Sequence, residues 1–340
     1  MTDPQHEIGH AGHSNLMPLP SSAAPALRAG TCAILVFMLQ LAACGGGSGG
    51  GAEPVSTTPT PPAPAPAPAP VPVPPPAPTP TPTPSPPPPP SPNPAYVPAT
   101  YQLMWADEFS IDGLPDESKW AYDTERNRLG WYNNELQYYS AARAENAQVS
   151  GGRLLITARR ESLSSATDWG GQRYTSTRLI TRGKADWTYG YFEVRAKLPC
   201  GRGTWPAIWM LGSQGVWPES GEIDLMEQVG SNPTRVFGTV HTLQSGGNGT
   251  GAAVQISDAC SAFHNYQMHW TADEIALAID GTTIYRYPNP RAGRSTWPFD
   301  TPQYLLLNVA IGGTLGGAVD DSIFPVTMEI DHVKIWQAPR

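Results

Sequence analysis

Residues 99–340 are predicted to form an all-β fold, a sandwich of two antiparallel sheets. No long stretch of this part repeats its apolar residues at the helical period, whereas several short stretches alternate between apolar and polar residues. Glycine, aspartate and proline separate these stretches, as turns between strands require. All eleven tryptophans lie here, and the length suits a single large all-β domain.

The predicted strands follow from alternation and turn signals. Residues 191–198 alternate with period two, which directs Phe192, Val194 and Ala196 to the core. The Asp280-Gly281 pair between two apolar runs is a strong signal for a hairpin over residues 275–285. The other predicted strands lie within residues 153–158, 174–179, 304–310 and 328–336.

Residues 1–44 are predicted to be a signal peptide. The apolar core at 33–39 is too short to span a bilayer, and residues 41–45, Leu-Ala-Ala-Cys-Gly, follow it. This ending resembles the lipobox of bacterial lipoproteins, which implies that Cys44 is lipidated. We therefore expect an exported protein anchored to a membrane through Cys44, at the cell surface (outer membrane). The alternative is an ordinary cleaved signal and a freely secreted protein.

Residues 45–98 are predicted to be a disordered linker, rich first in glycine and then in proline. Most of the 39 prolines lie between Pro54 and Pro98. Proline offers no amide donor to a sheet, and this stretch has no apolar face to bury. We expect an extended polyproline II spacer.

The formal net charge of −8 argues against a nucleic-acid partner. The sequence has no stripe of lysine and arginine that could neutralise phosphates. An acidic balance affects solubility and says nothing about a neutral polysaccharide. We expect a monomer that binds no nucleic acid.

Three carboxylates gather in residues 221–227, Gly-Glu-Ile-Asp-Leu-Met-Glu. In a regular strand Glu222 and Asp224 project to one face and Glu227 to the other. A β-bulge near Leu225 and Met226 would return Glu227 to the first face. A carboxylate pair about 5 Å apart is the machinery of a retaining glycosidase. Taken alone, the same alternation is also typical of a half-buried strand whose acids are in water.

The residues around this motif point to a family. Residues 203–212, Gly-Thr-Trp-Pro-Ala-Ile-Trp-Met-Leu-Gly, precede it, and residues 236–241, Val-Phe-Gly-Thr-Val-His, follow it. Over residues 101–337 the chain resembles glycoside hydrolase family 16, in its laminarinase-like branch. The resemblance implies a β-jelly roll with an open concave cleft. It also implies retaining, endo-acting hydrolysis of β-1,3-glucosidic bonds in laminarin-like β-glucans, without a cofactor for catalysis.

The resemblance assigns roles in that reaction. It implies Glu222 as the nucleophile and Glu227 as the general acid/base, with Asp224 between them holding Glu227 protonated by like-charge repulsion. The implied substrate-binding residues are Trp205, Trp209, His241, Asn134, Arg178 and Trp131. A hydrogen bond from His241 to Asp224 or Glu227 is feasible, and core packing is the alternative for the two cleft-floor tryptophans. The family has a small residue where Tyr132 stands, so a narrower cleft edge is expected.

The substrate within this family is narrowed by two features. Family members restricted to 1,3-1,4-glucans have one residue fewer between Asp224 and Glu227. Agar and carrageenan enzymes share the longer spacing but lack a stretch like residues 133–139, Asn-Asn-Glu-Leu-Gln-Tyr-Tyr. The loop at 312–317 lacks a tryptophan that some laminarinases carry, so mixed-linkage β-1,3-1,4-glucan stays an alternative. A non-catalytic glucan-binding protein is a further alternative, although such relatives have lost a glutamate.

Cys200 and Cys260 are predicted to form a disulfide, because an exported domain meets an oxidising compartment. The closed loop of about 60 residues would stabilise the fold by roughly 4 kcal/mol. Two free buried thiols are the alternative. Neither cysteine has the spacing of a metal ligand.

A structural calcium ion is expected from the resemblance, since several relatives bind one on the convex face. The candidate ligands are Glu108, Gly152 and Asp331. Asp331 also fits a solvent-facing strand residue.

Overall fold

The computed structural model describes residues 96–246 and 248–339. The predicted signal peptide at 1–44, the lipidation of Cys44 and nearly all of the linker at 45–98 lie outside the described residues. No helix in the described part of the chain is long and apolar enough to cross a membrane.

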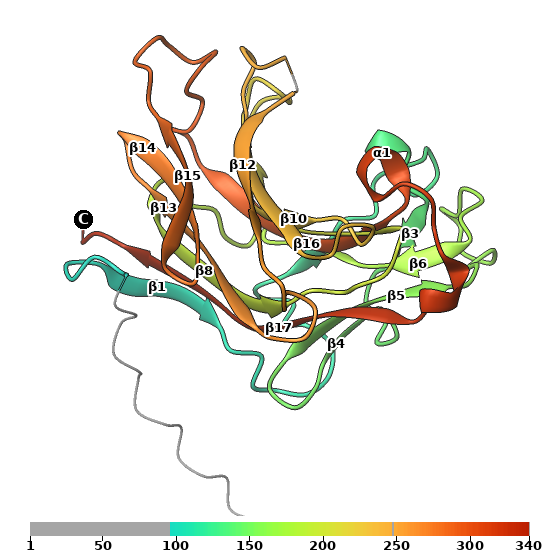
Figure 1. The fold of residues 1–340 in the computed structure, drawn as a ribbon. Coiled ribbons are helices and arrows are strands. Elements are labelled where there is room, and N and C mark those ends of the chain that lie inside the picture. Colours follow the sequence, from blue (N-terminus) through green and yellow to red (C-terminus); the bar gives the residue numbers. More distant parts are fainter. Residues whose placement is uncertain (1–95, 247, 340) are drawn as a thin grey trace, which may run out of the picture. The chain divides into compact units, whose positions relative to one another are not determined.

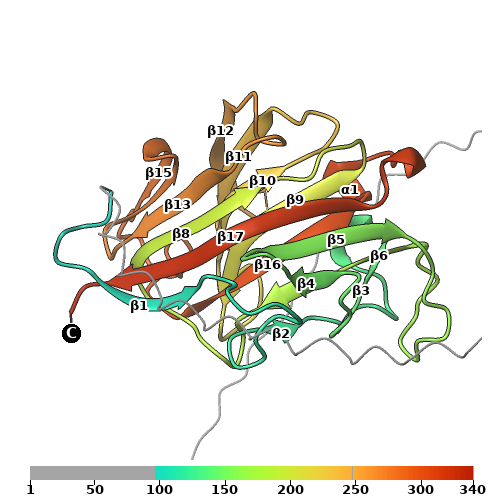
Figure 2. The same cartoon turned by 90° about the horizontal axis from the view of Figure 1, so that it is seen from below.

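The described chain forms two packed sheets, which confirms the predicted jelly-roll sandwich with an open face (Figure 1). The larger sheet has the order β15-β14-β13-β8-β17-β5-β6-β3, with β1 beside β17 and β4 beside β5. The smaller sheet has the order β12-β11-β10-β9-β16-β7-β2. All pairs are antiparallel except β3 with β6, which are parallel. Figure 2 looks onto the larger sheet, where β17 runs between β8 and β5.

The bounds of the elements are as follows. The strands are β1 Gln102–Asp107, β2 Ala121–Tyr122, β3 Gln137–Tyr139, β4 Ala147–Val149, β5 Leu154–Arg160, β6 Tyr174–Ser176, β7 Arg178–Ile180, β8 Gly190–Lys197, β9 Thr204–Gly212, β10 Glu222–Gln228, β11 Arg235–His241, β12 Thr250–Gln255, β13 His264–Trp270, β14 Glu274–Ile279, β15 Thr282–Pro288, β16 Gln303–Ile311 and β17 Val326–Gln337. The short helices are η1 Tyr132–Asn134, α1 Gly313–Gly316 and η2 Asp321–Ile323.

The core lies between the two sheets. Strand β8 directs Phe192, Val194 and Ala196 inward, as its alternation predicted. The smaller sheet contributes residues such as Ile208 and Ile223 to the same core. Trp205, Ala207 and Trp209 of β9 and the three acids of β10 lie on the opposite side from this core and line a cavity. Those outward residues form the functional face of the smaller sheet.

The predicted hairpin joins β14 to β15 through Asp280 and Gly281. Both residues have positive φ, 47° and 76°, as expected for the two central positions of a type I′ turn.

The predicted disulfide is confirmed between Cys200 and Cys260, whose Cα atoms are 5.8 Å apart. It ties the turn between β8 and β9 to the loop between β12 and β13. The Nε2 atom of Gln228, at the end of β10, lies 3.8 Å from each sulfur. The bridge therefore fixes the chain next to the strand that carries the three acids.

Candidate active site

The predicted bulge in β10 is confirmed by the strand register. Between Asp224 and Glu227, β10 advances three residues while β11 advances two, from Thr239 to Phe237. The register with β9 slips at the same place. The two residues inside the bulge, Leu225 and Met226, are both fully buried in the core. Because the bulge absorbs one residue, Glu227 returns to the face of Glu222 and Asp224.

A cavity in this face contains all three acids. Its lining is Asn133, Glu135, Trp205, Ala207, Trp209, Glu222, Asp224, Glu227, Asn308 and Ala310. These residues come from three neighbouring strands, β9, β10 and β16, and from η1 and the residue after it. In Figure 1 the strands β10 and β16 lie at the bottom of the space between β12 and α1.

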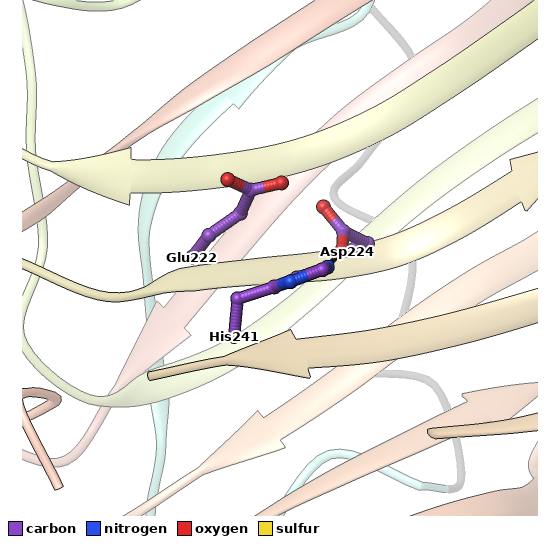
Figure 3. A group of neighbouring side chains, drawn as sticks. All are labelled: Glu222, Asp224 and His241. Atoms are coloured by element: carbon purple, nitrogen blue, oxygen red, sulfur yellow. Dashed lines mark ion pairs between the residues drawn. The ribbon is translucent and has the colours of Figure 1, made fainter. Parts of the chain in front are cut away.

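His241 pairs with the middle acid. Its Nε2 lies 3.2 Å from Asp224 Oδ2, and it stands opposite Glu222 in the β10–β11 register. Figure 3 shows the three side chains converging on one point. Asp224 and Glu227 were both predicted as possible partners of His241, and the pair seen in the structure is with Asp224.

Trp205 holds the third acid. Its Nε1 donates a hydrogen bond of 2.9 Å to Glu227 Oε1, and the indole is buried. Trp205 therefore fixes the direction of the Glu227 carboxyl group from the neighbouring strand β9.

Trp209 forms the floor of the cavity together with Asn308, which accepts a 2.7 Å hydrogen bond from its Nε1. The guanidinium of Arg178 lies 4.6 Å from the Trp209 ring and 5.2 Å from the Trp131 ring, and Arg178 Nε is 3.2 Å from Asp123. Trp131 is only 6 % exposed. Trp131 and Arg178 were predicted to bind substrate, but both are buried and neither belongs to the cavity lining. Arg178 instead contacts the rings of Trp209 and Trp131.

Asn134 was predicted to lie in the cleft, but the residue that lines the cavity is its neighbour Asn133. Asn133 and Asn134 both have φ of 58°, so the regular alternation of side chains is broken there. The difference follows from this turn, whose side-chain directions cannot be read from spacing.

Several site residues were not predicted. Asn308 and Ala310 lie two apart on β16, and Ala207 lies between the two predicted tryptophans of β9, so period-two alternation could have found them. Trp217 is 50 % exposed and lies 6.5 Å, ring to ring, from His241. It comes from a loop, where no periodic signal exists.

Glu135 is a fourth carboxyl group in the cavity, also unpredicted. Its Oε2 accepts hydrogen bonds from Gln137 Nε2 at 2.8 Å and from the Tyr139 hydroxyl at 3.4 Å. Burial raises its pKa above the ordinary value.

Comparisons with known proteins agree with this geometry. The sequence model described as glycosyl hydrolases family 16 matches residues 134–332. The chain belongs to glycoside hydrolase family 16. A β-glucanase of Rhodothermus marinus is 47 % identical over 252 residues, which cover 70 % of this chain and 85 % of that protein.

Two solved family 16 structures are also similar. SCLam, a non-specific endo-β-1,3(4)-glucanase, is 51 % identical with a TM-score of 0.69 and covers 72 % of this chain and 93 % of that one. A laminarinase from Rhodothermus marinus is 48 % identical with a TM-score of 0.66 and covers 71 % and 98 %.

Burial and repulsion from neighbouring acids raise the pKa of each of the three acids on β10 in this family 16 site. Burial and then the charge of Asp224 raise the pKa of Glu222 to about 8. Burial raises the pKa of Glu227 to about 7, against the hydrogen bond from Trp205, and the charge of Glu222 adds to the rise. Burial and the charge of Glu227 hold the pKa of Asp224 well above its usual range. The repulsion predicted between Asp224 and Glu227 thus raises the pKa of Asp224.

In the roles predicted from the sequence, Glu227 must be protonated and Glu222 ionised, so the raised pKa of Glu222 opposes its predicted role as nucleophile. The hydrogen bond between Glu222 and Asp224 raises the pKa of Glu222 and lowers that of Asp224, and the charge of His241 lowers the pKa of Glu222. Ionisation of Glu222 therefore requires its proton to leave this buried acid pair.

The two carboxylates predicted to bind calcium are each paired with a basic side chain. The Glu108 carboxylate lies 2.9 Å from Lys334 Nζ. Asp331 lies 3.4 Å from Arg195 Nε and 3.3 Å from His332 Nδ1. Gly152 could offer only its backbone carbonyl. Because basic side chains already neutralise both carboxylates, calcium binding there stays a prediction without structural support.

Among the described residues, Glu222, Asp224 and His241 do place ligand atoms within 4.8 Å of one another. Those atoms belong to the candidate active site, where His241 Nε2 lies 3.2 Å from Asp224 Oδ2.

Proposed function

We propose that this chain is a retaining endo-β-1,3-glucanase that cleaves laminarin-like β-glucans. The observation that carries the proposal is the β10 bulge, which sets Glu222 and Glu227 on one face of an open cavity, on either side of Asp224. The names of the similar proteins, laminarinase and endo-β-1,3(4)-glucanase, support this substrate class.

The reaction proceeds in two displacements. Glu227 protonates the leaving glycosidic oxygen while a carboxylate oxygen of Glu222 attacks the anomeric carbon and forms a glycosyl ester. Water then enters, gives its proton to Glu227 and attacks the same carbon, so that Glu222 leaves as a carboxylate. Two inversions retain the anomeric configuration. The cavity is open on its outer side, which suits a chain bound at an internal position.

Mixed-linkage β-1,3-1,4-glucan is the second candidate substrate. SCLam is described as non-specific between these linkages. The segment 312–317 beside the cleft carries Leu315 and no aromatic ring, so it lacks one stacking position that would select a substrate shape. A binding protein without activity is the third candidate, and the presence of both glutamates argues against it.

The test is a product profile on laminarin, lichenan and agarose side by side. We expect oligosaccharides of decreasing length from laminarin, less product from lichenan and none from agarose. Glu222→Gln and Glu227→Gln should each lower turnover by several orders of magnitude. Proton NMR of early products should show the β anomer first. Release of the α anomer first, or agarose as the best substrate, would contradict the proposal.

We further propose that the protein is exported, anchored to a membrane through Cys44 and monomeric. The lipobox-like residues 41–45 and the proline-rich segment after them support the anchoring. Size-exclusion chromatography with light scattering checks the monomer.

A further inference from the structure

The chain that follows β2 borders one end of the functional face. In the smaller sheet the strands run β10-β9-β16-β7-β2. Because neighbouring strands lie about 4.8 Å apart, β7 is about 14 Å from the acids on β10. Asp123, just after β2, pairs with Arg178 of β7 at 3.2 Å, and the segment ends in η1, whose Asn133 lines the cavity. A polymer that crosses the sheet from β10 toward β7 therefore reaches η1.

At this place η1 holds an aromatic ring in the solvent. Tyr132 is 62 % exposed, and the guanidinium of Arg126 lies 4.7 Å from its ring centroid. Arg126 is itself fixed, since its Nε donates a 3.3 Å hydrogen bond to the carbonyl of Gly130. The ring is thus positioned from one side by a cation and accessible from elsewhere.

The rim beside Tyr132 is apolar as well. Leu136 and Leu315 are both exposed. The backbone joins their segments, because Glu135 bridges to Gly312 and the Leu136 amide donates to the Ile311 carbonyl at 2.8 Å. Exposed apolar side chains that adjoin a binding cleft mark a surface for a ligand.

We propose that Tyr132 is the stacking platform of a further glucosyl subsite, which binds a sugar of the glucan chain several units away from the cleaved bond. The proposal rests on the β-glucan function proposed above. Pyranose rings present C–H faces that pack on aromatic rings, and the cavity that contains the acids leads to this rim through Asn133. The occupant is thus the same polysaccharide chain, extended beyond the residues that line the cavity.

The test is binding as a function of chain length. Calorimetry is carried out with laminari-oligosaccharides from the trisaccharide to the hexasaccharide, on the full-length chain with Glu222→Gln to prevent turnover. Adding Tyr132→Ala should weaken hexasaccharide binding about three- to tenfold, the range of one aromatic contact, and leave the trisaccharide unchanged. Tyr132→Phe keeps the ring and should bind as the parent does. Tyr96→Ala is the matched control, because Tyr96 is an exposed tyrosine outside the cavity lining.

Two results would overturn the subsite: hexasaccharide binding unchanged by Tyr132→Ala, or an equal loss for every chain length. Hydrolysis of laminarin by the wild type is measured in parallel. Its absence would contradict the proposed enzyme activity, while the binding series would still decide on Tyr132. If no variant bound any oligosaccharide while the wild type hydrolysed laminarin, the subsite proposal alone would fall.

Discussion

Glu227 receives opposing influences from two neighbours in the cavity. The Trp205 indole donates to its carboxylate and lowers its pKa, whereas the negative charge of Glu135 raises it. The balance, with burial as the largest cause, leaves the pKa at about 7. A general acid works in its protonated form, so its activity is present below this pKa and is lost as the pH rises through it. The alkaline limb of kcat/KM should therefore lie near neutral pH.

Two substitutions should move this limb in opposite directions. Trp205→Phe removes the hydrogen bond that favours the carboxylate, which raises the pKa of Glu227 and shifts the limb to higher pH by about one unit. Glu135→Gln removes a repelling charge, which lowers this pKa and shifts the limb to lower pH. The measurement is the pH dependence of kcat/KM on laminarin.

Glu117→Gln is the control for these two variants, because Glu117 is an exposed carboxylate outside the cavity lining. Its profile should coincide with that of the wild type. If both cavity variants moved the limb in the same direction, Glu227 would not be the group that titrates there.

At the level of the element, the bulge of β10 joins stability to chemistry. It buries Leu225 and Met226 together, and it keeps Glu227 beside Ala207 of β9 and Phe237 of β11. The register is regular on both sides of the bulge. Removal of one residue inside the bulge should therefore straighten the strand and leave all three acids on the same face. Removal of a residue before the bulge should instead turn Glu222 to the opposite face.

Two one-residue deletions test this. Without Met226, Glu227 falls an even number of residues from Glu222, so the acids stay on one face and part of the activity survives. The lost core side chain should cost about 2–5 kcal/mol, measured by urea unfolding. Without Ile223, Glu222 turns toward the core while the rest of β10 keeps its register, and activity should fall by several orders of magnitude.

Met226→Ala separates packing from register in this comparison. It keeps the chain length, so it should lose stability as the Met226 deletion does and retain the activity of the bulged strand. A Met226 deletion that folds but has no activity, or an active Ile223 deletion, would show that register does not control the position of the acids.

The strands and the acid site could be predicted because both depend on the alternation of side chains between the two faces of a strand. Alternation predicted the inward residues of β8, and the five-residue spacing of Glu222 and Glu227 required a bulge. Alternation gave no correct prediction where the backbone is not extended, as at Asn133. It also could not predict Trp217, because this side chain comes from a loop. Burial by distant partners was also invisible. Glu193 of β8 faces away from the core, yet His332 and Gln267 bury it by hydrogen bonds of 3.1 and 2.7 Å.

The same reason explains the predicted calcium ligands. Glu108 and Asp331 look free in the sequence because their cationic partners, Lys334 and Arg195, lie on strands that only the folded sheet brings alongside. Trp131 belongs to this group too. Its burial depends on Arg178, 47 positions later in the sequence (178 minus 131), and on Tyr139, whose ring is 4.7 Å away.

At the scale of the whole molecule, the larger sheet and the disulfide stabilise the smaller sheet, which carries the functional face. The bridge between Cys200 and Cys260 closes a loop 60 residues long, and it lies against Gln228, the neighbour of Glu227. In the part of the chain that the structure describes, the acids lie in a cavity on one face of the smaller sheet, and such a face suits a long polysaccharide. A long or insoluble substrate in turn favours an enzyme kept near the cell, which is what the sequence before residue 96 predicts.

Membrane anchoring through Cys44 is tested by fractionation. Cys44 lies outside the described residues, and the expectation rests on the lipobox-like residues 41–45 and on an apolar core too short to span a bilayer. Acyl chains on Cys44 would contribute about 0.8 kcal/mol for each buried methylene, so wild-type glucanase activity should sediment with membranes and incorporate a labelled palmitate analogue. Cys44→Ser should take up no label, and its activity should leave the membrane fraction. If both proteins were soluble, or if both sedimented without label, Cys44 would be no lipid anchor.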